Sequence, residues 1–182
     1  SVTAWAAYLG VATWKEQLVG KTEFEVARRL LVSVFKLQQA IQSCRSPFIS
    51  QNEFPDTYSF INQHTPSETA SAYVYIYNNR WKPIILAYEK FEIEATSAQA
   101  LWDEQITPPC ERLKFLVNKL SINTESTIAD HASGGKNFSH DSEFAISVRC
   151  VMHGGLGDSF NKEIEVEIDK IKLVTKLYIA KG

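Results

Sequence analysis

The sequence predicts an all-α protein, an antiparallel four-helix-type bundle whose long second helix is kinked near Pro83. Apolar residues recur at spacings of three and four along most of the chain, which is the period of an amphipathic helix. Two of these stretches follow patterns typical of helix starts, and no glycine interrupts the chain between Gly20 and Gly134. Helices joined by short connections bury their apolar faces most simply as an antiparallel bundle.

The N-terminal segment, residues 1–21, is predicted to be an apolar arm. Residues 1–14 carry no charge and include Trp5 and Trp14, and several basic residues follow them. A run of this length is too short to cross a bilayer, which takes roughly 20 apolar residues. Because the chain does not begin with Met, the alternative is the remnant of a membrane span that starts upstream, with the basic residues on the cytoplasmic side. Residues 22–182 are then the helical bundle domain.

The first helix of that domain is predicted to begin at Thr22 and to end near residues 44–46. Thr22 and Glu25 form a capping-box pattern, in which each side chain can bond to the backbone N–H of the other residue. Pro47 disfavours helical geometry at the residue before it, and residues 46–64 are expected to be a connection packed on the bundle. The apolar face of this helix is expected to contain Phe24, Ala27, Leu30, Leu31, Val34, Phe35, Leu37, Gln38 and Ile41.

The second helix is predicted over residues 66–104. Thr65-Pro66-Ser67-Glu68 combines a capping box with proline at the first helical position. Residues 72–77 alternate in a way that also fits a strand, but the two start signals favour a helix. Pro83 is expected to kink this helix or to separate two helices that meet near residues 80–83. Its apolar face is expected to contain Tyr73, Ile76, Tyr77, Trp81, Ile84, Ile85, Tyr88, Phe91 and Ala95.

Thr107-Pro108-Pro109 is predicted to end the second helix and to start another, with Thr107 as its N-cap. Residues 131–142 are rich in glycine and small polar residues, which predicts a mobile loop. Residues 143–152 alternate between apolar and polar, which fits a strand, but the lack of a partner strand favours a short helix. The apolar face of the helix after Thr107 is expected to contain Leu113, Leu116, Val117 and Leu120.

The last helix is predicted to follow a turn at residues 154–157, with Asp158 or Ser159 as its N-cap. Residues 164–168 also alternate with period two, which fits a strand. The absence of Gly and Pro from Lys162 to Lys181 favours a helix instead. Its apolar stripe is expected to contain Ile164, Ile168, Ile171, Val174 and Tyr178.

The composition excludes several functional classes. Lysine and arginine number 19 against 21 acidic residues, and this balance gives no bias toward nucleic acid. The three cysteines are widely spaced and odd in number, so they fit a reducing compartment better than a disulfide framework. The chain contains neither a P-loop nor a nucleophile-elbow motif. We therefore predict no catalytic residue, no metal ligand and no cofactor.

An alternative hypothesis is a small hydrolase or a metal-dependent enzyme that uses residues 131–153. Cys150-x-x-His153 has the spacing of metal ligands, and serine, histidine and aspartate occur together in residues 131–141. Against it, a structural zinc site usually takes four ligands in close pairs, and nearness in sequence does not establish catalytic geometry. The residues available to such an enzyme are His131, His140, Asp141, Cys150 and His153.

Five residues are predicted to bind a partner: Arg28, Arg29, Arg45, Tyr75 and Trp81. The adjacent Arg28 and Arg29 form a basic patch that fits a solvated helix face or an anionic lipid surface better than readout of nucleic acid. Arg45 lies at a helix end, where interaction with the helix dipole is an alternative role. The second helix carries more tyrosine and tryptophan than one apolar stripe needs. Tyr75 is therefore expected off the core face, which is typical of protein–protein surfaces.

Three stretches resemble a group of uncharacterised bacterial proteins: Trp14-Lys15-Glu16-Gln17-Leu18-Val19-Gly20-Lys21, Glu25-Val26-Ala27-Arg28-Arg29-Leu30-Leu31 and Arg45-Ser46-Pro47-Phe48. Arg80-Trp81 and Leu101-Trp102 extend the similarity beyond the first 55 residues, which carry most of it. The resemblance implies an N-terminal membrane helix followed by a cytoplasmic helical domain, with no activity and no catalytic residues. This chain departs from that pattern because it lacks a complete membrane span.

Together these observations predict a non-enzymatic helical domain for protein interaction or regulation. A protein partner or self-association is expected, and a membrane tether through the N-terminus is a further prediction. The expected location is the cytoplasm or the cytoplasmic face of the inner membrane. Nucleic acid is not expected as a partner.

Overall fold

The computed structural model describes residues 2–154 and 157–180. These residues form five α-helices and one short 3₁₀-helix, and they contain no strand, so the all-α prediction is confirmed. The stretch 143–152 is helical as predicted, since it lies within α4. The elements in chain order are α1 (Val2–Cys44), η1 (Gln51–Glu53), α2 (Pro66–Ala132), α3 (Lys136–His140), α4 (Ser142–Met152) and α5 (Ser159–Ile179).

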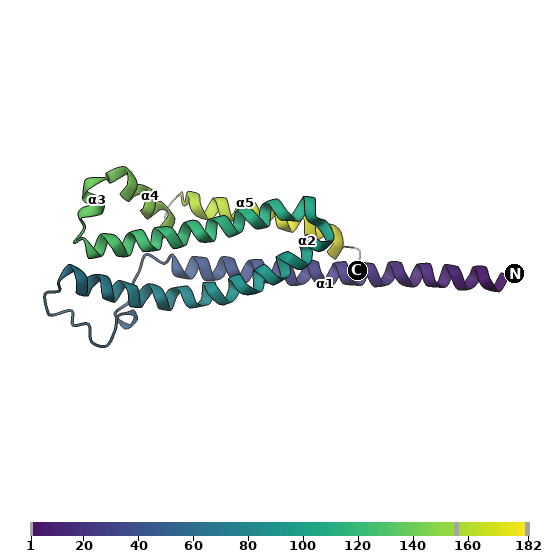
Figure 1. The fold of residues 1–182 in the computed structure, drawn as a ribbon, viewed down its shortest axis with the longest axis horizontal. Coiled ribbons are helices and arrows are strands. Elements are labelled where there is room, and N and C mark those ends of the chain that lie inside the picture. The colour runs from purple at the N-terminus through teal and green to yellow at the C-terminus, as the bar shows by residue number, and fades with distance from the viewer. Residues whose placement is uncertain (1, 155–156, 181–182) are drawn as a thin grey trace.

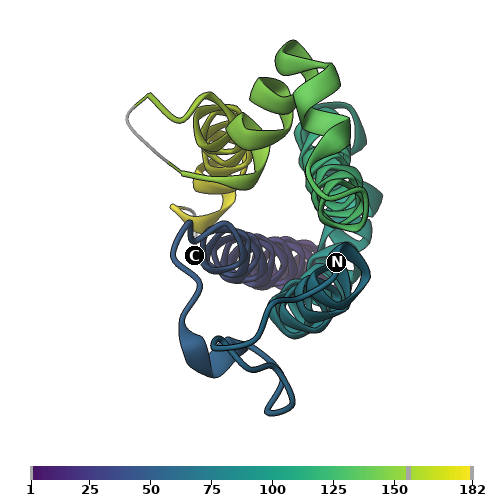
Figure 2. The same cartoon turned by 90° about the vertical axis from the view of Figure 1, so that its left-hand side faces the viewer.

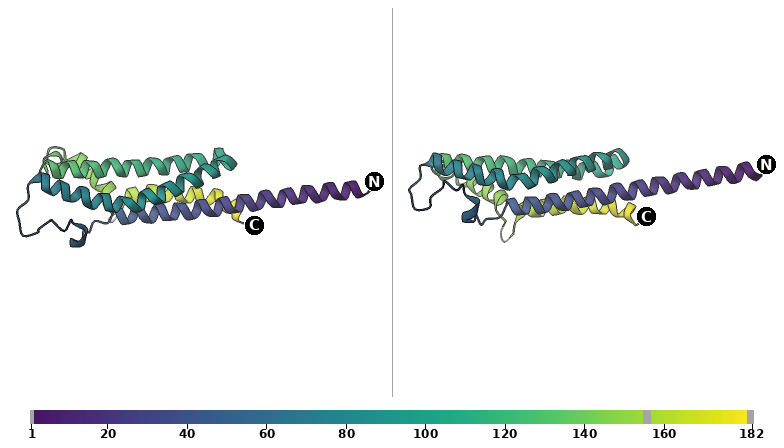
Figure 3. Two further views of the ribbon diagram at one scale, coloured as in Figure 1. Left: turned by 60° about the horizontal axis from the view of Figure 1, so that its bottom comes forward. Right: turned by 90° about the horizontal axis from the view of Figure 1, so that it is seen from below.

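The long helices lie side by side and run in alternating directions (Figures 1 and 3). α1 runs toward one end of the molecule, and the first part of α2 returns alongside it. The second part of α2 then runs back, and α5 returns in the opposite direction. Seen end-on, α1 and α5 lie on one side and the two parts of α2 on the other (Figure 2). The N-terminal part of α1 extends beyond the rest of the molecule.

The apolar core lies between these helices. The last helix contributes the stripe predicted for it, with Ile164, Ile168 and Ile171 fully buried and Val174 and Tyr178 packed at the edge of the core. Two predicted core positions are wrong, because Phe35 of α1 and Ile85 of α2 are exposed. The largest fully buried side chains are Phe91, Phe160, Leu30, Leu37, Ile41, Ile76, Ile84, Ile106, Leu113, Leu116, Leu120 and Met152.

The predicted helix start at Thr22 is wrong, because α1 already begins at Val2. The Thr22 hydroxyl donates a hydrogen bond to the carbonyl of Leu18, one turn earlier, at 2.9 Å, instead of capping a helix. The N–H groups that a cap would satisfy are already bonded within the longer helix. The side chain of Trp5, which the membrane-remnant hypothesis places at a bilayer surface, lies outside the described residues.

The kink expected near Pro83 is not confirmed. Backbone angles in α2 stay helical through Pro83 and depart from the helix at Trp102, where φ is −137° and ψ is 37°. The chain reverses direction within α2 (Figure 1), and Trp102 is where its backbone leaves helical geometry. Thr107 is inside α2 and donates a hydrogen bond to Asp103, so it is not the N-cap that the sequence predicts.

Two other helix starts agree with the sequence. Thr65 caps α2 and forms the full capping box with Glu68. Asp158 caps α5 by accepting a hydrogen bond from the backbone N–H of Asn161 at 2.9 Å. The stretch 131–142, predicted as a loop, contains the short helix α3, which follows a turn where Gly134 and Gly135 have positive φ.

No helix within the described residues has the length and apolar content that crossing a membrane requires.

Candidate functional site

A surface depression lies between α1 and the first part of α2. It consists of two adjoining cavities of about 260 and 450 Å³, which share Lys36 and Lys90. We call this depression the α1/α2 groove. One cavity is lined by Arg28, Arg29, Val32, Ser33, Lys36, Lys90, Ile93 and Glu94, and the other by Lys36, Gln39, Ala40, Ser43, Pro83, Leu86, Ala87 and Lys90.

The α1/α2 groove is basic. Its lining includes four positive side chains and one acidic side chain, Glu94. Glu94 accepts a hydrogen bond from Nε of Arg29 at 3.0 Å, and Arg28 forms an ion pair with Glu25 at 3.8 Å, so each arginine has an acidic partner. Neither Lys36 nor Lys90 forms an ion pair with any described residue. The groove therefore presents unpaired positive charge to solvent.

The groove also exposes apolar side chains. Leu86 and Ile93 of α2 are 62% and 65% exposed, and Val32 of α1 lines the same cavity as Ile93. Leu86 and Ile93 are seven residues apart, close to two helical turns, so they lie on one face of α2. Tyr75 precedes Leu86 by close to three turns and extends the same exposed face toward the start of α2.

Arg28 and Arg29, both predicted as binding residues, therefore come together in the groove. Tyr75 is exposed, as expected, on the same face of α2. Trp81 is half-buried between the two parts of α2, where its Nε1 donates a hydrogen bond to the hydroxyl of Thr124 at 3.2 Å.

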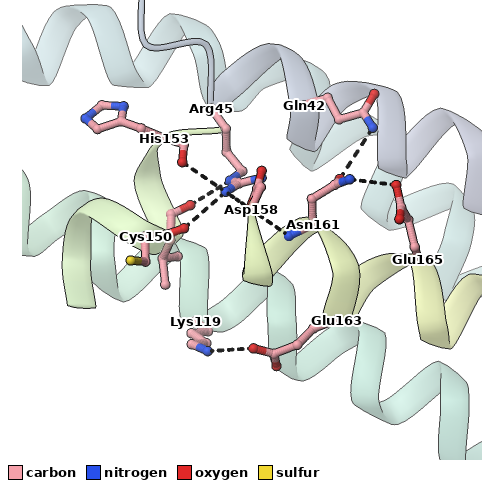
Figure 4. Close-up of polar contacts among 10 residues, drawn as sticks. Gln42, Arg45, Lys119, Cys150, His153, Asp158, Asn161, Glu163 and Glu165 are labelled. Atoms are coloured by element: carbon pink, nitrogen blue, oxygen red, sulfur yellow. Dashed lines mark hydrogen bonds and ion pairs between the residues drawn. The ribbon is translucent and has the colours of Figure 1, made fainter. Parts of the chain in front are cut away.

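Arg45 lies inside the molecule, where its side chain is only 3% exposed. Its Nη1 and Nη2 each donate to one oxygen of Asp158 at 2.8 Å, and Nε donates to the carbonyl of Val151 at 2.6 Å. Nη2 also donates to the carbonyls of Cys150 and His153 (Figure 4). We call this set the Arg45 clamp. It joins the end of α1 to the end of α4 and the start of α5, so the structure gives Arg45 an internal role.

A second arginine, Arg80 of α2, binds the connection that follows α1. It donates hydrogen bonds to both carboxylate oxygens of Glu53. It also donates to the carbonyls of Cys44, Ser46 and Phe48. These carbonyls include free acceptors at the C-terminal end of α1, which a cation satisfies well. We call this set the Arg80 clamp.

The carboxylates of both clamps have lowered pKa values. Hydrogen bonds from Arg80 are the main reason that the pKa of Glu53 lies below its ordinary value of 4.5. Burial alone would raise the pKa of Asp158, but hydrogen bonds from Arg45 and from the backbone of Asn161 lower it below 3.8. A carboxylate with a lowered pKa binds fewer protons in the folded state than in the unfolded chain. Its stabilising effect is therefore complete above its ordinary pKa and disappears as the pH falls through the folded value.

We accordingly expect the free energy of unfolding to fall as the pH drops below about 4.5, because the carboxylates of Glu53 and Asp158 become protonated. Asp158→Asn should be less stable than the wild type at pH 7, and the difference between the two should narrow toward pH 3. Urea denaturation of both proteins across this pH range measures the effect. A difference that stays constant down to pH 3 would contradict the role of the Asp158 carboxylate.

The residues of the alternative enzyme hypothesis do not gather in one site. Cys150 and His153 line one surface cavity, whereas His131 lines another. His131 of α2 stacks on Tyr73 with ring centroids 3.6 Å apart, and Asp141 caps α4. Cys150 and His153 are neighbours of the Arg45 clamp, but the His153 ring points away from the Cys150 thiol (Figure 4). In the described ranges, no three residues among His, Cys, Asp and Glu come close enough to hold a metal ion.

Of the residues that line the groove, the sequence identified only Arg28 and Arg29 as binding residues, and it missed Leu86, Lys90 and Ile93 among others. One signal could have found two of them. The second helix contains the consecutive run Ile84-Ile85-Leu86, which is wider than one core stripe needs, and Ile93 lies outside the stripe that contains Phe91 and Ala95. The pairing of this face with Arg28 and Lys36 could not be found, because it depends on how α1 and α2 pack.

Comparisons of this chain with models of known families, with curated proteins and with solved structures give no match.

Proposed function

We propose that this chain is a non-enzymatic antiparallel four-helix-type bundle that binds another protein through the α1/α2 groove. We further propose that the bound element is an acidic amphipathic helix. The observation that carries the proposal is the combination of exposed apolar side chains and unpaired lysines in one groove between two helices.

The dimensions of the groove fit a helix. Its lining residues on α1 run from Arg28 to Ser43, which corresponds to about 23 Å along the helix axis, or roughly four turns. A helix that lies in a groove between two others typically anchors itself with apolar residues at spacings of three, four and seven. Leu86 and Ile93, two turns apart, match that spacing.

The positive charge of the groove favours a negatively charged partner. Lys36 and Lys90 are close to the apolar residues and free of intramolecular ion pairs among the described residues. Aspartate or glutamate side chains that flank the apolar stripe of a bound helix would pair with them. Such complementarity contributes to specificity and association rate, and it weakens as ionic strength rises.

A membrane tether through residues 1–21, and a location at the cytoplasmic face of the inner membrane, stay predictions. They are independent of the groove, whose lining begins at Arg28.

Two synthetic peptides of about 18 residues test the proposal: one carries a leucine stripe flanked by glutamates, and the other carries the same stripe flanked by lysines. We expect the acidic peptide to bind the full chain at least about tenfold more tightly than the basic one in fluorescence anisotropy. The double variant Lys36→Glu with Lys90→Glu should reverse this preference.

Lys136→Glu is the matched control, because Lys136 is an exposed lysine on α3, away from the groove. It should leave the affinity for the acidic peptide unchanged. Equal binding of the two peptides, or binding that survives reversal of both groove lysines, would refute the groove as the docking site.

A further inference from the structure

The outer face of α5 carries a second apolar surface that does not touch the α1/α2 groove. Val166, Leu173 and Leu177 are 52%, 69% and 57% exposed. With Lys170 they follow spacings of four, three and four, so they form one continuous stripe along the helix. The buried residues Ile164, Ile168 and Ile171 lie on the opposite side of α5. We call this exposed set the α5 stripe.

The spacing of the α5 stripe is that of the contact positions in a two-stranded coiled coil. α5 lies at the outside of the molecule, beside α1 and the second part of α2 (Figure 2). Its outward face can therefore be reached by another helix. The residues next to the stripe decide which helix fits.

Asp169 and Lys176 flank the α5 stripe on the same side, seven residues apart. In an antiparallel pair of two identical α5 helices, Asp169 of one copy faces Lys176 of the other copy, and the two-fold symmetry repeats the contact. This flank of α5 is thus electrostatically complementary to the same flank of a second copy. They are also accessible, because the side chain of Asp169 is largely exposed and its bond to Lys172 is a surface pair within one helix.

The residues of the α5 stripe also favour antiparallel pairing of the two helices. An antiparallel pair places Val166 opposite Leu177 of the second copy, and Lys170 opposite Leu173. A parallel pair would instead stack Lys170 on Lys170, which places like charges together at the centre of the contact. In the antiparallel pair the Lys170 ammonium stays at the edge of the contact, where Glu167 already binds it at 2.9 Å.

We propose that α5 pairs with α5 of a second copy of this chain as an antiparallel, two-fold symmetric dimer through Val166, Leu173, Leu177, Asp169 and Lys176. The stripe from Val166 to Leu177 spans only about 17 Å, so the contact is small and the dimer is weak. We expect a dissociation constant on the order of 100 µM.

Sedimentation equilibrium of the full chain over a range of concentrations tests the dimer. The wild type should show a monomer–dimer equilibrium. Leu173→Lys should be monomeric, because it places a second lysine against Lys170 of the partner copy. Ile122→Lys is the matched control, since it changes an exposed apolar residue of α2 in the same way and should leave the dimer intact.

Charge reversal tests the orientation. Asp169→Lys and Lys176→Asp should each weaken the dimer by roughly tenfold, because each turns two attractive contacts into repulsive ones. The double variant that carries both changes restores opposite charges across the pair and should recover the wild-type dimer. Circular dichroism checks that each variant keeps its helices.

The proposal is wrong if the wild type remains monomeric at concentrations near 1 mM, well above the expected dissociation constant. It is also wrong if Leu173→Lys still dimerises or if the double reversal fails to restore pairing. Each of these outcomes leaves peptide binding at the α1/α2 groove unaffected, so the two proposals can fail separately.

Discussion

Arg45→Ala is expected to lower the free energy of unfolding by about 3–5 kcal/mol, the usual loss when one partner of a buried ion pair is removed. The guanidinium of Arg45 is buried, and it binds both oxygens of Asp158 as well as carbonyls at the end of α4. Its removal leaves the carboxylate and these carbonyls without their donor. It also removes a cation that lies 4.8 Å from the centre of the Phe160 ring.

Urea denaturation of the wild type and the variant at pH 7 measures this effect. Arg29→Ala is the matched control, because Arg29 also binds an acidic residue of another helix but is half exposed. We expect Arg29→Ala to lower the free energy of unfolding by less than about 1 kcal/mol, which is the usual contribution of an exposed ion pair. Similar losses in the two variants would show that the Arg45 clamp does not hold α1, α4 and α5 together.

Arg45→Lys separates charge from geometry. Lysine keeps the positive charge but cannot donate two parallel hydrogen bonds to a carboxylate while also reaching neighbouring carbonyls. We expect its stability to lie between those of the wild type and Arg45→Ala. Stability equal to that of the wild type would mean that charge alone is sufficient at this position.

Trp102→Ala is expected to lower the free energy of unfolding by about 3–5 kcal/mol, as for other buried tryptophans. Trp102 is buried at the point where α2 reverses direction, and its ring stacks on Tyr178 of α5 with centroids 4.2 Å apart. The indole thus ties the end of α5 to the bend in α2. Its loss leaves a large cavity at the interruption of α2.

Trp102→Phe should lower the free energy of unfolding much less, by under about 2 kcal/mol, since an aromatic ring still stacks on Tyr178. The indole Nε1 has no hydrogen-bond partner among the described residues, so phenylalanine loses no hydrogen bond there. Chemical denaturation compares the two variants. Equal losses for Trp102→Phe and Trp102→Ala would contradict the view that packing, and not the N–H group, stabilises this bend.

The local signals in the sequence account for much of the helical structure. Thr65 and Asp158 cap helices where their side chains predict it, because an N-cap acts on N–H groups only two or three residues away. The buried face of α5, with Ile164, Ile168 and Ile171, follows from helical period alone. Residues 143–152 form a helix although their alternation fits a strand, since residues 2–154 and 157–180 contain no strand that could offer the hydrogen bonds a strand needs.

The N-caps predicted from local sequence at Thr22 and at Thr107 are wrong. Both residues have the chemistry of an N-cap, but each lies within a longer helix whose backbone hydrogen bonds continue past it. A cap stabilises an end where one exists and does not create one. The bend at Trp102 is accompanied by stacking on Tyr178, which is 76 residues away in sequence and so lies beyond the reach of local patterns.

Local patterns in the chain establish that this protein is helical, which stripes its helices bury and where two of the helices begin, because these features depend on neighbours within one or two turns. The packing of distant segments places Arg45 against Asp158, sets Arg28 and Lys36 across a groove from Leu86 and Ile93, and leaves the outer face of α5 exposed. Helical period specifies which face of a helix is apolar, whereas the packing of distant segments decides what that face meets.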